Sequence, residues 1–263
     1  MNKVFLDYDQ AALDAQYDQR VWAPDMDAVI ARYAAASDAV RARLGEPATH
    51  AYGPSAVERL DVYGTGRPKV LVFVHGGAWR RESRRASAWA ADAIIRSGGT
   101  YVALGFAALP AVSLPEMVRQ ICDGIDWVKR HLGGRILLCG HSSGAHLAAC
   151  ALTRVDGIAR ALLICGIYDL LPVRLSARNE YLKLDAKQEQ DLSPLRHRER
   201  IRCPVQVAWA EKDSAEFIRQ SREFAAALRA PTLAGKDLDH FRMAETLADP
   251  RSPLGAAALA MLE

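Results

Sequence analysis

Features that would indicate a membrane, secreted or nucleic-acid-binding protein are scarce in this chain. No apolar run approaches the roughly 18 residues that a membrane-spanning helix needs. Residues 1–15 contain Asp7, Asp9 and Asp14 where a secretion signal would have its apolar centre. The net charge is only +3, and the basic residues are scattered instead of being clustered with aromatic ones. We therefore expect neither a membrane nor a nucleic acid as a partner.

Cysteine is also scarce, and its five residues have no spacing typical of a metal site. Most of them lie in apolar runs, so we expect reduced cysteines in the core, and we predict a cytoplasmic protein. The chain shows no internal repeat and no shift of composition that would mark a linker. A single domain over residues 1–263 is the prediction.

The most informative stretch is GRILLCGHSSGAHLAAC, at residues 134–150. An apolar run that favours a buried strand leads into Gly-His-Ser-Ser-Gly, which is followed by small residues typical of a tightly packed helix. In such a turn the serine hydroxyl is presented at the tip, and the flanking glycines let the strand and the helix approach closely. Ser142 is therefore the predicted nucleophile.

A second motif, HGGAW, ends the apolar run at residues 70–75. Two glycines after a buried strand allow backbone N–H groups to converge on the oxyanion that forms when a serine attacks a carbonyl carbon. We predict that Gly76 and Gly77 form this oxyanion hole together with the N–H of Ser143.

The acid and the base of a serine hydrolase on a parallel sheet follow the nucleophile in that order. Asp213 comes directly after an apolar strand pattern, and His240 follows the last predicted strand, so these are the predicted partners of Ser142. Glu211 and Glu216 remain alternative acids. Water would release the acyl group, so no cofactor is expected.

The other histidines are expected to have structural roles. His75 and His141 should orient the backbone or fill space beneath the serine turn, and His146 lies one helical turn beyond it. Asp237 and Asp239 stand beside His240, but no second pair of ligands has a recognisable spacing, so we predict no metal.

Strand and helix patterns alternate along the chain, which predicts a mainly parallel sheet with helices on both faces. Ligands bind at the carboxyl ends of such strands, where both glycine motifs fall. An N-terminal helical segment is predicted at residues 8–44, and residues 167–203 are expected to form a small helical insertion over the site. Strands are predicted at 57–63, 70–75, 100–106, 136–139, 160–165, 205–210 and 232–234, and further helices at 84–97, 115–132 and 217–228.

Several motifs together resemble the kynurenine formamidase (arylformamidase) group of α/β hydrolases. They are HGGAW, GHSSGAHLA, the GIYDLLPV segment that runs on to Asn179 and Leu192-Ser193-Pro194, EKDSAEF and the DHF at residues 239–241. The resemblance covers most of the chain and implies an α/β-hydrolase fold. It also implies a triad of Ser142, Asp213 and His240, with the HGG turn at Gly76 and Gly77. The implied reaction is hydrolysis of N-formyl-L-kynurenine to formate and L-kynurenine.

The chain departs from the usual residues of this group at three positions. Ala78 replaces a tyrosine, Ser143 an alanine and Cys165 a serine. These changes leave the triad intact and concern the acyl and leaving-group pockets. Trp79 and Tyr168 are candidates for lining the leaving-group side, and both fit a place in the core equally well.

Three functions therefore stay open. An arylformamidase is the leading hypothesis. A carboxylesterase for small acyl or aryl esters would use the same triad with less difficulty, since an alkoxide leaves more readily than an amine. A small-molecule binder without turnover is disfavoured, because binding alone needs no nucleophile with a base and oxyanion donors. The expected partner is a small-molecule substrate, and a homodimer is left open.

Overall fold

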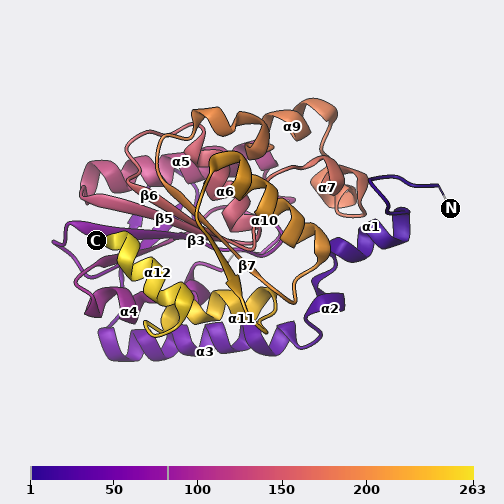
Figure 1. Ribbon diagram of the computed structural model, residues 1–263. Helices are drawn as coiled ribbons and strands as arrows, with labels where there is room; N and C mark the ends of the chain where they lie inside the picture. The colour runs from indigo at the N-terminus through magenta and orange to yellow at the C-terminus, as the bar shows by residue number, and fades with distance from the viewer. Residues whose placement is uncertain (1, 82) are drawn as a thin grey trace.

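The fold is built on an eight-stranded sheet in the order β1-β2-β4-β3-β5-β6-β7-β8. The strands of this sheet lie in the middle of the molecule, between layers of helices (Figure 1). The computed structural model describes residues 2–81 and 83–263, so Met1, the first residue of the predicted domain, lies outside the described part. β2 runs antiparallel to both of its neighbours, and the strands from β4 across to β8 are parallel. The strands are β1 (Ala48–Ala51), β2 (Arg59–Tyr63), β3 (Lys69–Val74), β4 (Thr100–Leu104), β5 (Arg135–His141), β6 (Arg160–Ile164), β7 (Val205–Ala210) and β8 (Thr232–Gly235).

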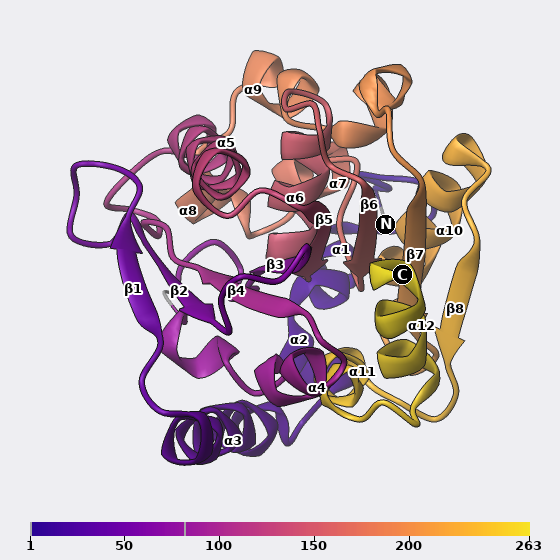
Figure 2. The same ribbon diagram turned by 90° about the vertical axis from the view of Figure 1, so that its left-hand side faces the viewer.

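Helices cover both faces of this sheet, as predicted, and each face has its own apolar core (Figure 2). One face carries α5 (Leu114–His131), α6 (Ser143–Leu152) and α10 (Ala215–Leu228). The other carries α3 (Met26–Leu44), α4 (Ala91–Arg96), α11 (His240–Glu245) and α12 (Pro253–Leu262). The central strands are continuous apolar runs because both of their faces are buried.

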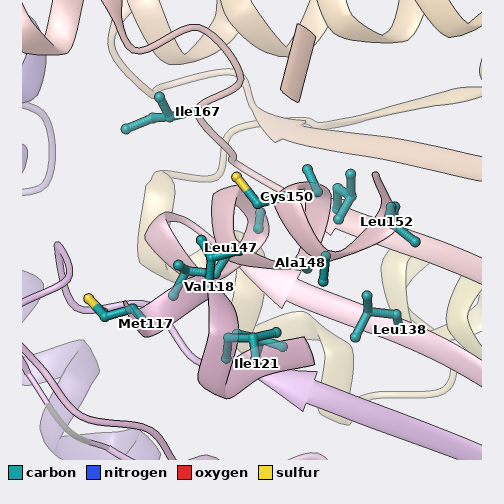
Figure 3. Packing of buried hydrophobic residues seen from close by; sticks show 14 of the residues in the cluster. Met117, Val118, Ile121, Leu138, Leu147, Ala148, Cys150, Leu152 and Ile167 are labelled. Atoms are coloured by element: carbon teal, nitrogen blue, oxygen red, sulfur yellow. The ribbon is translucent and has the colours of Figure 1, made fainter. Parts of the chain in front are cut away.

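The packing of α5 on α6 holds the helix that follows the serine turn. Met117, Val118 and Ile121 of α5 belong to the same buried cluster as Leu147 of α6 and Leu138 of β5 (Figure 3). α6 is buried along its whole length, which explains its run of small residues. The start of α6 is therefore fixed against the sheet.

The N-terminal segment differs from one continuous amphipathic helix. It consists of α1 (Gln10–Tyr17), α2 (Gln19–Trp22) and α3, because Asp18 takes an extended conformation that ends α1 and caps α2. α1 lies beside α7 (Leu171–Leu175) and packs against α10 (Figure 1). Residues 167–203 hold α7, α8 (Asn179–Leu182), α9 (Ala186–Asp191) and the 3-10 helix η2 (Pro194–Arg200).

One predicted helix is wrong, and β1, α11, α12 and a 3-10 turn near the end of the chain were not predicted. The helix expected at 84–97 is a 3-10 turn, η1 (Arg85–Ser87), followed by the short α4. β1 has the sequence ATHA and is largely exposed at the sheet edge, so it lacks an apolar pattern. α12 and the 3-10 turn η3 (Thr246–Ala248) close the chain. Among the described helices, none is both long and apolar enough to cross a membrane.

Candidate active site

Ser142 lies in a sharp turn between β5 and α6. Its backbone has φ 57° and ψ −125°, a strained conformation for a residue with a side chain. The turn depends on its glycines, because a Cβ on Gly140 would lie 2.5 Å from the Gly144 carbonyl oxygen. A Cβ on Gly144 would lie 2.2 Å from the carbonyl oxygen of Val74 on β3. The Ser142 hydroxyl makes no capping hydrogen bond to α6, so it is available to act as a nucleophile.

Asp213 and His240 form a buried hydrogen-bonded pair. His240 Nδ1 donates to Asp213 Oδ2 over 2.6 Å, and the two residues are 1% and 3% exposed. The other carboxylate oxygen of Asp213 accepts from the N–H of Ser214 at 2.9 Å. Asp239 caps α11 by accepting from two backbone N–H groups, so its carboxylate serves the helix whose first residue is His240. The pair has the geometry in which an acid fixes the tautomer of a catalytic histidine.

His141 connects the serine turn to the segment that carries His240. Its Nε2 donates to the His240 carbonyl oxygen at 3.0 Å, and the two ring centroids are 4.9 Å apart. Burial lowers the pKa of His141 to about 3, so the ring stays neutral. β5 and β7 end at the same edge of the sheet, and the structure therefore brings Ser142, Asp213 and His240 to one rim.

The HGGAW loop lies directly against the serine turn. A Cβ on Gly76 would lie 2.9 Å from the His141 carbonyl oxygen and 3.1 Å from Ser142 Cβ, so glycine is required for this close approach. The next three residues all have positive φ, at 122° for Gly77, 53° for Ala78 and 60° for Trp79. The Trp79 N–H donates to Ser143 Oγ at 3.3 Å. Ser143 thus ties the predicted oxyanion loop to the start of α6 through its side chain.

Two further histidines support this loop from beneath. His75 donates from Nδ1 to the Gly76 carbonyl oxygen at 2.8 Å, and His146 accepts from Trp79 Nε1 at 3.2 Å. His146 in turn donates to the Leu192 carbonyl oxygen at 2.8 Å. Burial lowers the pKa of both imidazoles to about 4. They are neutral parts of the scaffold, in line with the structural roles expected from the sequence.

Trp79 and Tyr168, the candidates for substrate contacts, are both core residues in this structure. Trp79 is 1% exposed, and Tyr168 is fully buried with its ring stacked 4.1 Å from that of Phe224. The Tyr168 hydroxyl has no hydrogen-bond partner among the described residues. A direct contact of either ring with substrate stays a prediction.

The alternative acids have other surroundings. Glu216 is buried in an ion pair with Arg219, with 2.8 Å between Oε2 and Nη2. Glu211 is exposed. Within the described part of the chain, the carboxylate bonded to the His240 ring is that of Asp213.

The chain is 34% identical to the kynurenine formamidase of Danio rerio, in an alignment that covers 95% of both proteins. The chain belongs to the kynurenine formamidase family. The enzyme of that name from Salmo salar is 33% identical over 75% of this chain and 76% of its own length. Residues 60–157 of this chain match the BD-FAE family model. The matched stretch includes both glycine motifs, HGGAW and GHSSG.

Solved structures confirm the α/β-hydrolase fold of this family member. A Silicibacter protein provisionally assigned to the thioesterases has a TM-score of 0.84 at 26% identity, covering 95% of this chain and 98% of its own. Esterase B from Lactobacillus rhamnosis has a TM-score of 0.68 at 19% identity, covering 93% and 94% of the two chains. The latter likeness shows the fold alone.

One polar residue near the site of this kynurenine formamidase family member has no signal in the sequence. Gln19 of α2 donates from Nε2 to Asp213 Oδ1 at 3.3 Å and is 7% exposed. Its contact spans 194 positions of the chain, so no local pattern could indicate it. The N-terminal segment therefore reaches the predicted catalytic acid.

Among the described residues, one buried cluster has side chains of the types that hold a metal. Potential ligand atoms of His141, Cys165 and His240 lie within 4.8 Å of one another. An ion bound there would compete with the hydrogen bonds of His141 and His240. The hydrogen bond of His240 to Asp213 leaves its other ring nitrogen for the role of a base, and no metal is assigned to this cluster.

Proposed function

We propose that this chain hydrolyses N-formyl-L-kynurenine, or a similar aryl formamide, to formate and the free amine. The observation that carries the proposal is the buried Asp213–His240 pair at the rim that holds the Ser142 turn, in a chain of the kynurenine formamidase family. Ser142 is only 7% exposed, which suits attack on an acyl group as small as formyl. The proposed substrate is a small molecule, the kind of partner that the sequence predicts.

In the first half of the proposed reaction, His240 accepts the hydroxyl proton of Ser142 as the oxygen attacks the formyl carbon. The carbonyl oxygen becomes an oxyanion that backbone N–H groups of the HGG loop and of Ser143 stabilise. Asp213 holds the imidazole in the correct tautomer and stabilises its charged form. Return of the proton to the amide nitrogen breaks the C–N bond and releases the amine.

In the second half, water attacks the formyl ester on Ser142. His240 takes the proton of the water, and collapse of the second tetrahedral intermediate returns that proton to the serine oxygen. Formate leaves, and the enzyme is restored. Every proton transfer uses the same imidazole, so this sequence requires no cofactor.

The test compares kcat/KM for N-formyl-L-kynurenine with kcat/KM for short p-nitrophenyl esters. A value for the esters higher by several orders of magnitude would defeat the formamidase proposal in favour of a carboxylesterase. Ser142→Ala and His240→Ala should each abolish turnover of both substrates. A fluorophosphonate probe should label wild-type Ser142, and a folded protein without that adduct would be a binder.

We also propose that the enzyme works in the cytoplasm, which is supported by its five unpaired cysteines. Fractionation of the native host followed by detection of the protein would test this location. Recovery with a membrane or secreted fraction would argue against it.

A further inference from the structure

Arg178, at the start of α8, lies between two aromatic residues of distant segments. Its guanidinium carbon is 5.7 Å from the ring centroid of Tyr17 and 5.9 Å from that of Trp79. Nε and Nη2 both donate to the Tyr17 carbonyl oxygen, at 3.0 Å and 2.5 Å. The third nitrogen, Nη1, is shielded from solvent and has no hydrogen-bond partner among the described residues.

An unpaired cationic donor of this kind is costly. A buried charged group that has lost its water without gaining an acceptor destabilises the fold by more than a neutral group does. Two other arginines of the 167–203 segment are ion-paired, Arg174 with Glu189 and Arg196 with Asp169. Nε of Arg174 also lacks a hydrogen-bond partner, so an unused nitrogen does not by itself indicate a ligand. Arg178 differs because, among the described residues, it has no carboxylate partner, and its Nη1 is left available for one.

The position of Arg178 relates this edge to the reacting atoms. Trp79 belongs to the loop that donates to Ser143, next to the predicted nucleophile. Tyr17 lies two residues before Gln19, whose side chain donates to Asp213. Arg178 is therefore bracketed by two segments that each reach one side of the triad. A substrate bound at Ser142 would place its leaving group near these segments if it occupies the space between them.

We propose that Arg178 binds the α-carboxylate of the amino-acid portion of the formamide substrate. This inference rests on the proposed function, because N-formyl-L-kynurenine carries its formamide on an aryl ring and a carboxylate at the end of a short chain. A guanidinium group is opposite in charge to a carboxylate, and its planar pair of N–H donors fits the two carboxylate oxygens better than an ammonium group does. Arg178 as a residue is partly exposed, and Nε and Nη2 are held by the Tyr17 carbonyl oxygen, so Nη1 is the nitrogen left to donate to a carboxylate. The enzyme then selects formamides of amino acids over neutral formanilides.

The experiment measures Arg178→Gln on two matched substrates, N-formyl-L-kynurenine and its decarboxylated analogue N-formylkynuramine. The variant should raise KM for the carboxylate substrate about 10- to 100-fold with a much smaller change in kcat, since the contact is present in both ground and transition states. For the decarboxylated analogue, kcat/KM should change less than about 3-fold. In the wild-type enzyme, kcat/KM should be higher for the carboxylate substrate than for its decarboxylated analogue, and this difference should disappear in Arg178→Gln.

Arg80→Gln is the matched control. Arg80 is exposed, and its guanidinium lies 4.7 Å from the ring of Tyr181 on the same helix α8. The control removes the same charge from the same neighbourhood, so a general electrostatic effect would appear in both variants. We expect both substrates to lose less than about 3-fold in kcat/KM, the size of a surface-charge effect.

Distinct outcomes would overturn the inference. An equal loss on both substrates would make Arg178 a structural residue, and no loss on either would remove it from binding. If Arg178→Gln does not fold, Arg178→Lys keeps the charge without the fork, and its loss must again be confined to the carboxylate substrate. A wild-type enzyme inactive on both formamides would refute the proposed function itself.

Discussion

Replacing Asp213 by asparagine tests the proposed catalytic pair with little change of shape. Asp213 Oδ1 accepts from the Ser214 N–H and from Gln19, contacts that an amide oxygen retains. The group then opposite His240 Nδ1 is an NH₂ donor, which forces the imidazole into the tautomer with its proton on Nε2. That tautomer cannot accept a proton from Ser142. We expect kcat to fall on the order of 10⁴-fold, or about 5 kcal/mol in activation free energy.

The assay follows release of L-kynurenine at saturating N-formyl-L-kynurenine, with circular dichroism and thermal unfolding to show that the variant is folded. Glu211→Gln is the control, since this exposed alternative acid lies two residues before Asp213. It should leave kcat unchanged. A folded Asp213→Asn variant that keeps more than about a tenth of wild-type kcat would refute the assigned pair.

Three further predictions concern the surroundings of the site. The buried histidines beneath it have pKa values depressed below 6.5, so the unfolded chain binds protons that the native chain does not. The contribution of these neutral histidines to the free energy of unfolding is therefore fully present above about pH 6.5. It falls toward pH 4 with a slope approaching about 4 kcal/mol per pH unit. Urea unfolding at pH 7, 6 and 5 would measure this slope, and a free energy of unfolding that does not change with pH would contradict the prediction. Gln19→Ala should lower kcat about 10-fold and leave KM nearly unchanged, because it removes a hydrogen bond to the Asp213 carboxyl group. Gln19→Glu should not restore kcat, and a change in KM alone would contradict this prediction. Gly144→Ala places a Cβ 2.2 Å from a backbone oxygen of β3, and should destabilise the protein by about 3 kcal/mol or more in urea unfolding, whereas a stability within 1 kcal/mol of wild type would contradict the close approach.

The local motifs of the site could be predicted because each is confined to a few neighbouring residues. Gly140, Ser142 and Gly144 encode one turn, and the apolar runs before them encode buried strands. A parallel sheet then brings strand ends together without any further information. The predicted meeting of Asp213 with His240 follows from this topology.

The contacts that could not be predicted join segments far apart in the chain. Gln19 and Arg178 each reach partners more than 150 positions away, and their own surroundings in the sequence are ordinary helical residues. Burial of an aromatic ring raised a different difficulty. Tyr168 follows a strand in the same way as a pocket residue would, and only the packed position of Phe224 shows where its ring lies. The spacing of apolar residues shows which face of a helix or strand is buried. It does not show which other residues pack against that face.

The N-terminal and C-terminal segments lie at opposite ends of the strands of the sheet. The N-terminal helices approach the triad, whereas Glu263 pairs with Lys69 at the first residue of β3, with 2.6 Å between Oε1 and Nζ. Figure 1 shows the termini on opposite sides of the molecule. An enzyme attached to a bead or an electrode through Glu263 would thus have the rim that holds Ser142 facing away from the support. A fusion partner joined at Glu263 would lie away from that rim and leave the path of the substrate open.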